Sequence, residues 1–449
     1  MKLFTFSAYR PVLALLTGLV SCAVASAGIP ITHWVQASGA QVYLVESPAI
    51  AMVDVQIDFD AGSRRDPADK AGLANLTAQS TSNGVLPHGS APALDEQGLS
   101  QAWADLGASF SGAAGTDRMS FKLRSLTYPD LLPQAIALAA RQLAMPSFPN
   151  APWQRDRVKL IASLKEADTR PATVAGRAFS QALYGSHPYG FEMKAPTLQR
   201  ITVQDMRAQH ARAVRPCAAR ISIVGALTRL QADALVTQLL APLPATRCSA
   251  LPTLAEVASL QKSQDIRIAF KSAQAHLLHG QPGYKRNDPD FFALTVGNHI
   301  LGGGGFTSRL TNEVREKRGL TYSVYSYFEP GLHAGSFTVG LQTRPDQADQ
   351  ALQLVQEVLK NFVQQGPTET ELQAAKDNLI GGFALRIDSN RKLLDNVANI
   401  AWNNLPLDYL DTWTQRVQQL STADIQAAFA RKLQPDTMAT VVLGGAEKK

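Results

Sequence analysis

The sequence has few cysteines, few aromatic residues and no apolar run long enough to cross a membrane. It contains 3 cysteines and 7% aromatic residues among 449. No segment reaches the roughly 18 consecutive apolar residues of a membrane-spanning helix. The formal charge of +6 is small for this length, and no run of Lys and Arg is interleaved with aromatic residues. The sequence therefore predicts neither a membrane span nor a nucleic-acid-binding surface.

The start of the chain, 1–27, has the pattern of a secretory leader. Lys2 and Arg10 give a basic start, PVLALLTGLV is a short apolar run, and positions 25–27 read Ala-Ser-Ala. This order predicts cleavage before Gly28 and export, most simply to a periplasm. The alternative is a bacterial lipoprotein box that ends at Cys22, which would attach the chain to a membrane by a lipid.

If Cys22 leaves with the leader, Cys217 and Cys248 remain in the mature chain. Two cysteines in an exported protein are candidates for a disulfide. The sequence does not give the distance between them, so a pair of unlinked small residues is the alternative.

The chain contains one unit twice. ITVQDMRAQHARAVRPCAARISIVGAL begins at Ile201, and the similar LSTADIQAAFARKLQPDTMATVVLGGA begins at Leu420. Each copy reads as a Ser/Thr-led helix, a Pro and a β-branched strand. The repeat predicts two similarly folded domains. The expected boundaries are a leader 1–27, an N-terminal domain 28–240, a linker 241–260 and a C-terminal domain 261–449.

Strand and helix patterns are interspersed, and several strands alternate apolar with polar residues. The stretch 53–59, VDVQIDF, alternates throughout. Such alternation is typical of an antiparallel sheet with one covered face. We therefore expect an α+β fold in which each domain is a mainly antiparallel sheet with helices packed on it.

The stretch 301–328, LGGGGFTSRLTNEVREKRGLTYSVYSYF, resembles the C-terminal signature of the pitrilysin-like (M16) zinc peptidases, the family of the mitochondrial processing peptidases. The resemblance implies two domains of the processing-peptidase-like metallohydrolase fold, which face each other across a cleft. It also implies that Arg315 and Tyr322 bind the peptide substrate. We expect Arg315 at the end of a helix stopped by Gly319, and Tyr322 at the start of the next strand. Gly302–Gly305 is expected to be a flexible turn after a helix that ends near Leu301.

The zinc-binding motif of this family, H-x-x-E-H, is replaced in this sequence. Matching the flanking residues puts Asn75, Ala78 and Gln79 at the positions of the two ligands and the general base. Ala162 or Ser163 stands where the third ligand, a Glu, is expected. None of the His residues lies in a zinc-binding motif; His276 and His279 should point to opposite faces of a strand, and His210 should be a packing residue. We therefore expect no cofactor in this chain.

The resemblance implies a division of labour between two chains. A partner subunit that carries H-x-x-E-H would hold the zinc, and this chain would contribute Arg315 and Tyr322 to the binding of unfolded peptides. On this interpretation the isolated chain is not a peptidase. Two alternatives are a structural protein on the same fold and an enzyme with unrecognised chemistry.

Overall fold

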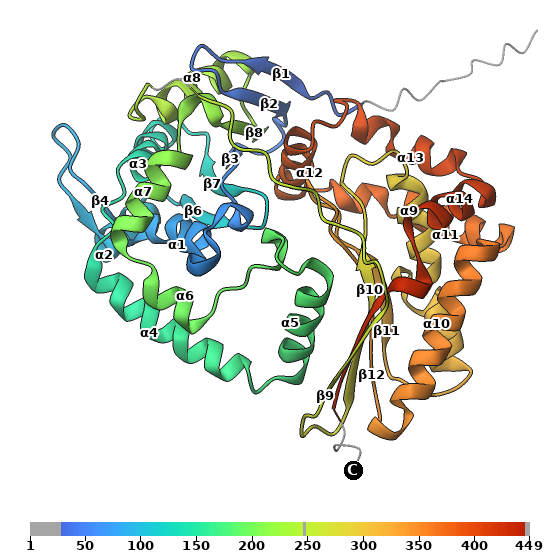
Figure 1. Ribbon diagram of the computed structural model, residues 1–449. Helices are drawn as coiled ribbons and strands as arrows, with labels where there is room; N and C mark the ends of the chain where they lie inside the picture. The colour runs from blue at the N-terminus through green and yellow to red at the C-terminus, as the bar shows by residue number, and fades with distance from the viewer. Residues whose placement is uncertain (1–27, 246–247, 445–449) are drawn as a thin grey trace, which may run out of the picture.

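The computed structural model describes residues 28–245 and 248–444. The predicted leader and the lipoprotein box at Cys22 lie outside these residues. Within them, no helix has both the length and the apolar character needed to cross a membrane. The fold is α+β, as expected, and it consists of two domains, each built on its own sheet (Figure 1).

The N-terminal domain contains a six-stranded sheet. Among its described strands, β2 and β8 are parallel, and all other neighbours are antiparallel. In sheet order the strands are β1 (Thr32–Val35), β2 (Gln41–Glu46), β8 (Arg220–Gly225), β3 (Met52–Phe59), β7 (Met119–Leu126) and β6 (Ser109–Ala114). The small hairpin β4 (Gly84–Val85) and β5 (Leu94–Asp95) lies outside it.

Eight helices belong to the described part of this domain. They are α1 (Leu73–Ser80), α2 (Glu96–Asp105), α3 (Leu132–Ala144), α4 (Asn150–Ala167), α5 (Pro171–Tyr184), α6 (Ala195–Arg200), α7 (Val203–Ala213) and α8 (Arg229–Leu240). The core lies between one sheet face and the helices α3 and α8, where Ile57, Phe121 and Leu239 are fully buried.

The C-terminal domain repeats the same strand order. Its sheet runs β11 (Val324–Phe328), β12 (Ser336–Thr343), β10 (Ala275–Pro282), β13 (Ala439–Leu443) and β9 (Gln264–Ile268). The last two strands are parallel, as are β8 and β2 in the first copy. The described helices are α9 (Phe291–Asn298), α10 (Ala348–Gln365), α11 (Glu369–Gly381), α12 (Asn390–Trp402), α13 (Tyr409–Gln419) and α14 (Thr422–Lys432).

The sequence repeat is also visible in the helix starts. In α7, Thr202 and Asp205 form a capping box, and Ser421 and Asp424 form the same box at the start of α14. These reciprocal bonds satisfy backbone N–H groups that a helix start leaves free. The two helices therefore begin at equivalent positions for the same local reason.

One expectation about the sheet is wrong. The polar residues of β3 are not on a solvent face: Asp54, Gln56 and Asp58 are all buried. They are covered by α12, which comes from the other domain and lies across β3 and β8 (Figure 1). In return α5, the counterpart of α12 in the first copy of the repeat, lies across β10 and β13. Each domain therefore contributes the equivalent helix to its neighbour's sheet.

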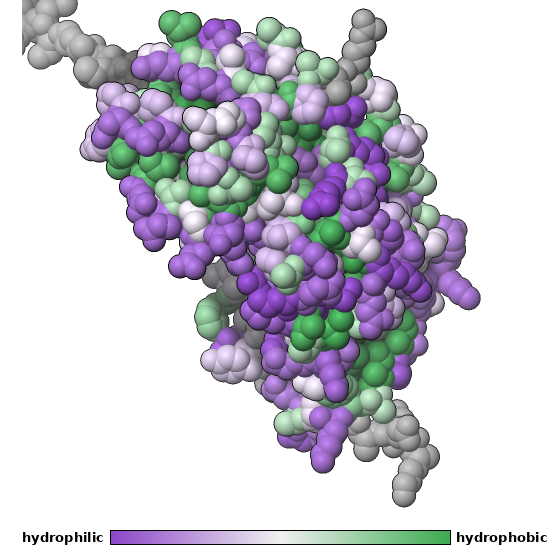
Figure 2. All heavy atoms as spheres, turned by 90° about the vertical axis from the view of Figure 1, so that its left-hand side faces the viewer, coloured by the Kyte–Doolittle hydropathy of each residue, from purple (hydrophilic) through white to green (hydrophobic). Residues whose placement is uncertain are grey.

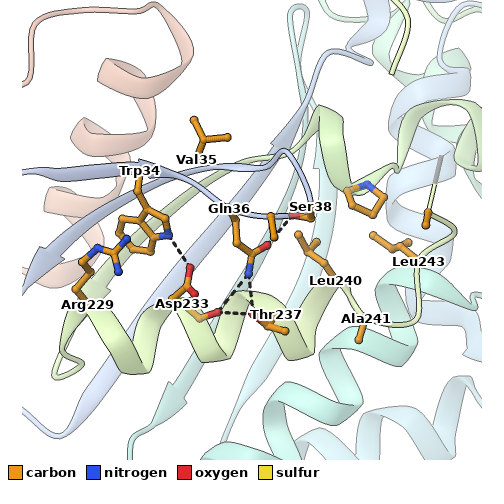
Figure 3. Close-up of a pocket in the computed structure, with 13 residues that line it drawn as sticks. Trp34, Val35, Gln36, Ser38, Arg229, Asp233, Thr237, Leu240, Ala241 and Leu243 are labelled. Atoms are coloured by element: carbon orange, nitrogen blue, oxygen red, sulfur yellow. Dashed lines mark hydrogen bonds between the residues drawn. The ribbon is translucent and has the colours of Figure 1, made fainter. Parts of the chain in front are cut away.

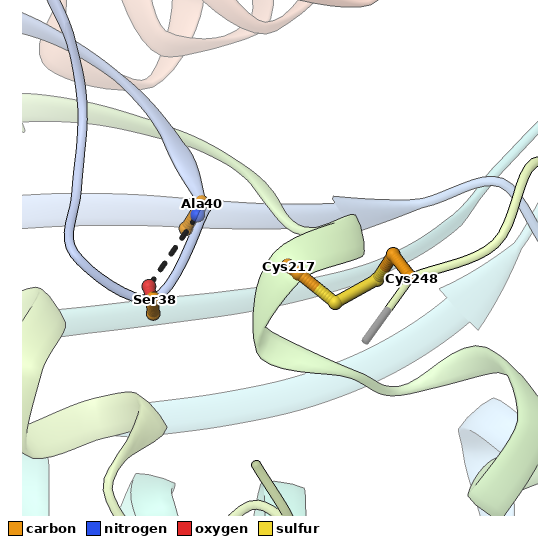
Figure 4. The surroundings of a disulfide bond; sticks show 4 residues. All are labelled: Ser38, Ala40, Cys217 and Cys248. Atoms are coloured by element: carbon orange, nitrogen blue, oxygen red, sulfur yellow. Dashed lines mark hydrogen bonds between the residues drawn. A yellow bond between two sulfur atoms is a disulfide. The ribbon is translucent and has the colours of Figure 1, made fainter. Parts of the chain in front are cut away.

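The segment between α8 and β9 has no helix or strand among its described residues. Near its start Cys248 forms a disulfide with Cys217, with a Cα–Cα distance of 5.9 Å (Figure 4). The bond ties this segment to the short turn before β8.

On the outer face of the N-terminal side, polar side chains predominate, with small apolar areas between them (Figure 2).

Candidate functional site

Arg315 lies in a π-helical turn, Thr311–Glu316, where the sequence pattern predicts ordinary helix. The expected apolar side is present, because Leu310 and Val314 are fully buried. Gly319 lies just beyond this turn and stops the helix as expected: its φ of +60° favours glycine, and its N–H donates to the Arg315 carbonyl at 2.8 Å. The buried side fixes the turn, so the Arg315 side chain points away from the core.

Tyr322 lies in the connection just before β11, which begins at Val324 and not at Tyr322 as expected. Thr321 fixes this connection, because its hydroxyl donates to the carbonyls of Ser323 and Gln342 at 2.8 and 2.6 Å. Thr321 is buried, whereas the neighbouring Tyr322 is 82% exposed. A buried anchor next to it therefore directs the phenol outward.

The structure brings Arg315 and Tyr322 together. The guanidinium carbon of Arg315 lies 5.0 Å from the centre of the Tyr322 ring and 4.7 Å from the centre of the Phe306 ring. Contacts of this length are cation–π interactions. Arg315 Nε also lies 3.3 Å from a Glu316 carboxylate oxygen. The cation is thus held between two rings, with its side chain 27% exposed.

Phe306 was not predicted as a site residue. It is 70% exposed, and an exposed ring that close to Arg315 and Tyr322 forms a small aromatic surface. The only signal in the sequence is its place directly after the glycine run. Phe306 lies in a short 3₁₀ turn, Gly305–Thr307, which carries it toward Arg315.

The glycine run differs from the flexible turn that the sequence suggests. A π-helical turn, His299–Gly303, continues α9 through the first two glycines. A Cβ on Gly302 would lie 2.5 Å from Ser326 Oγ, and one on Gly304 would lie 2.6 Å from the His299 carbonyl. These glycines therefore allow close packing beneath the site. π-Helical turns are frequent at functional sites, and here two of them precede Tyr322.

A pocket of about 310 Å³ opens beside Tyr322. It lies between the start of α5, from the N-terminal domain, and the face of β10 and β11. Ala172 and Leu278 contribute apolar surface to it, and Tyr325 contributes a second ring. Burial lowers the pKa of His276, which also lines it.

The positions of the family's zinc motif lie on α1 but do not converge as ligands. Asn75 Oδ1 accepts a hydrogen bond from the Ala114 N–H at 3.1 Å, which fastens α1 to β6. Ala78 is fully buried, and Gln79 is exposed. These three side chains do not fit a zinc ion. The Asn75 amide oxygen already accepts a hydrogen bond, Ala78 offers only a methyl group, and Gln79 offers only a neutral amide. Ala162 and Ser163, at the third position, are both exposed on α4.

The segment that leads into α1 has a structural role. The Asp66 carboxylate accepts from the N–H groups of Gly72 and Ala74, each at 2.9 Å, at the start of the helix. Burial raises the pKa of Asp66 to about 6. Arg64 is buried and donates to Asp117 at 3.0 Å. These hydrogen bonds therefore fix the start of α1.

The remaining histidines do not assemble a site. His276 and His279 lie on opposite faces of β10, as expected, and His279 is buried. His210 is buried on α7, and its Nε2 lies 2.8 Å from the Leu143 carbonyl, which confirms a packing role. Within residues 28–245 and 248–444, no three His, Cys, Asp or Glu side chains are grouped as a metal site requires.

A separate concavity of about 660 Å³ lies between β1 and α8, far in sequence from Arg315 (Figure 3). Its polar groups largely bond to one another. The Trp34 indole donates to Asp233 at 2.6 Å, Gln36 donates to Thr237 at 2.8 Å, and Arg229 lies over the Trp34 ring. None of the predicted site residues lines it.

Comparison with known proteins places these features in a family. The model described as "Insulinase (Peptidase family M16)" matches residues 41–197, and "Peptidase M16 inactive domain" matches residues 200–379. A crystal structure of a peptidase M16 inactive domain from Pseudomonas fluorescens is 35% identical, with a TM-score of 0.87. The match covers 93% of this chain and 100% of that one. The chain belongs to peptidase family M16. It is an M16 protein in which the zinc-binding motif is replaced.

Two curated relatives differ in the share of their length that this chain matches. An uncharacterized zinc protease of Streptomyces coelicolor is 34% identical over 162 residues, which is 36% of this chain and 35% of that protein. The non-peptidase homolog YmxG of Helicobacter pylori is 26% identical over 388 residues, which is 85% of this chain and 86% of that protein.

Proposed function

We propose that this chain is the non-catalytic, substrate-binding subunit of a two-chain M16 zinc peptidase. The observation that carries the proposal is the contrast between the Arg315–Tyr322 pair and the replaced zinc motif on α1. Arg315 and Tyr322 are in contact and reach solvent, whereas Asn75, Ala78 and Gln79 offer no zinc ligands. A partner of the same family with an intact H-x-x-E-H would supply the metal and the general base.

The role of this chain in that complex follows from its donors. A guanidinium and a phenol both donate hydrogen bonds, and both can meet one carbonyl oxygen of an extended peptide. Donors aimed at the oxygen where charge develops stabilise the transition state more than the substrate. The rings of Phe306 and Tyr322 hold the guanidinium in place, so less freedom is lost when the peptide arrives.

The proposal includes export, most simply to a periplasm. The Cys217–Cys248 disulfide supports an oxidising compartment. The non-peptidase homolog of Helicobacter pylori supports the absence of catalysis by this chain, because it matches over 85% of the sequence. The substrate would be unfolded peptide, since the donors recognise backbone groups that a folded protein keeps paired.

The test is reconstitution with an M16 chain that carries H-x-x-E-H and comes from the same organism. We expect peptide turnover only when both chains are present, and no stoichiometric zinc in this chain after dialysis. One Zn²⁺ per chain by elemental analysis, or turnover by this chain alone, would contradict the proposal. A complex that forms but gains no turnover would favour a structural role.

A further inference from the structure

We propose that a contact between the two domains at His187 is a pH-sensitive switch, which holds a loop of the C-terminal domain at neutral pH and releases it in acid. The loop is 329–335, which joins β11 to β12 at the end of β11 away from Tyr322. The N-terminal domain contributes the short 3₁₀ turn Pro188–Gly190, which begins directly after His187. The inference does not depend on the proposed function.

The loop is bound by two side chains of the N-terminal domain. The Leu332 N–H donates to Asp117 Oδ2 at 2.9 Å. The His333 N–H donates to Tyr189 Oη at 3.0 Å, and Tyr189 Oη in turn donates to Asp117 Oδ1 at 2.7 Å. A Cβ on Gly331 would lie 2.7 Å from Tyr189 Oη, so the glycine permits this close approach. The position of Tyr189 therefore decides whether the loop stays bound.

His187 fixes the turn that carries Tyr189, and its two ring nitrogens have different partners. Nδ1 lies 3.1 Å from the backbone nitrogen of Tyr189, and Nε2 lies 3.0 Å from the Ala255 carbonyl oxygen. A backbone N–H can only donate and a carbonyl can only accept. Nδ1 must therefore be the acceptor, and Nε2 must carry the hydrogen. Both contacts together require the neutral imidazole ring.

A second proton can enter this ring only at Nδ1. It would remove the acceptor of the Tyr189 N–H, because an imidazolium has two donors and no acceptor. The new cation would also face the His333 ring, whose centre lies 5.6 Å from the centre of the His187 ring. Protonation thus removes the hydrogen bond that fixes the turn beneath Tyr189, whereas the bond from Nε2 to Ala255 can remain.

The charged and titratable groups around this contact come from both domains and from the segment between them. They are Arg64, Asp117, Tyr189, Glu256, Lys285 and His333. Burial lowers the pKa of His187, and the His333 ring and the Arg64 guanidinium act in the same direction. The Ala255 carbonyl and the Glu256 carboxylate oppose them without reversing the shift. Because the pKa is lower in the folded chain than in the unfolded chain, the contact is at full strength above about pH 6.5 and weakens as the pH falls below that value.

The experiment measures hydrogen exchange of the mature chain at about pH 7.5 and about pH 5.5, on either side of the usual pKa of histidine. Each observed rate is divided by the intrinsic rate at the same pH, which gives a protection factor. In the wild-type chain, the protection of the loop 329–335 should fall about 5-fold at the lower pH, as expected for the loss of one hydrogen bond.

Two changes at His187 should fix the switch in one state each. His187→Asn keeps a side-chain oxygen that can accept from the start of the turn but does not titrate, so the loop should keep its protection at the lower pH. His187→Ala removes the acceptor, so the loop should be weakly protected at both pH values. The matched control is His88→Asn, which makes the same change at an exposed histidine and should respond as the wild type does.

His333→Gln tests whether the switch lies at His187 or at the neighbouring ring. The loop is bound through the backbone N–H of residue 333, so this variant should still lose protection at the lower pH. The inference is overturned if His187→Asn loses protection as the wild type does, or if His333→Gln alone abolishes the pH response. Equal protection of the wild-type loop at the two pH values would also overturn it.

Discussion

The two helices that cross between the domains occupy equivalent positions but make chemically different contacts. The contact of α5 with the C-terminal sheet is apolar: Phe179 and Leu183 pack on Val441 and Leu443. The contact of α12 with the N-terminal sheet combines a polar contact with apolar packing, in which Tyr43, Val45 and Val224 join the core of the C-terminal domain. Arg220 donates to the Trp402 carbonyl at 2.6 Å, in the last turn of that helix.

The polar contact is built around the end of α12. The guanidinium groups of Arg118 and Arg220 lie 5.8 and 5.3 Å from the centre of the Trp402 ring. Arg118 also donates to the Ala398 carbonyl at 3.1 Å and pairs with the buried Asp58 at 2.9 Å. Cations are favourable near the carbonyl end of a helix, where carbonyls lack partners.

Equivalent helix positions are thus stabilised by two kinds of interaction, which respond differently when a single side chain changes or moves. Apolar burial does not depend on the geometry of individual donors, whereas a charged contact is lost when one donor moves. The pocket beside Tyr322 is built on the apolar contact, because α5 forms its wall. We therefore expect the α5 contact to persist when the polar contact of α12 opens.

The largest expected effect is from Phe179→Ala in the apolar contact. Phe179 is 5% exposed, and removing such a ring typically costs about 3–5 kcal/mol of the free energy of unfolding. Urea unfolding at low and high salt measures the loss, which should be the same at both. Phe306→Ala is the matched control, because that ring is 70% exposed and should cost about 1 kcal/mol or less. A loss at Phe179 as small as the control would show that α5 is not held by burial.

A smaller loss of stability is expected on acidification, and it arises from one buried histidine of the C-terminal sheet. Burial lowers the pKa of His279 to about 4, against about 6.5 in the unfolded chain. The unfolded state then binds more protons between these values, so stability is full above pH 6.5 and falls as the pH drops toward 4. The loss from this group is about 3 kcal/mol. His279→Gln does not titrate, so its free energy of unfolding should fall less over that range. Parallel pH curves for the two proteins would refute the assignment.

The smallest of the three stability effects is expected at the polar contact. Arg220→Met keeps most of the side-chain volume but removes the hydrogen bonds to the carbonyls of Ala401 and Trp402. This change should lower the free energy of unfolding by about 2 kcal/mol. The loss should be local, so hydrogen exchange should rise in the last turn of α12 and not in α5. Lys122→Met is the control, since its pair with Asp395 is half-exposed and should be worth about 1 kcal/mol or less. Equal exchange in α5 and α12 would mean that the two contacts open together.

Sequence patterns predicted the repeat and its Ser/Thr-led helix starts because these depend on local spacing. They gave the wrong environment for Asp54 and Asp58, since alternation along a strand cannot reveal a helix contributed by another domain. The Arg315–Tyr322 pair was predictable because both residues belong to one short motif. The pocket was not, because Ala172 reaches it from a distant part of the chain, in the other domain.

The most direct test of the account is the turnover of peptides by the reconstituted complex with Tyr322→Phe, compared with Tyr327→Phe. Both changes remove one hydroxyl from a solvent-accessible tyrosine, and gel filtration checks that both complexes assemble. The account predicts that Tyr322→Phe lowers kcat by about 10²–10³, because a donor to the developing oxyanion is lost. Tyr327→Phe should retain the wild-type rate. Full turnover by an assembled Tyr322→Phe complex, across several peptides, would contradict the central claim.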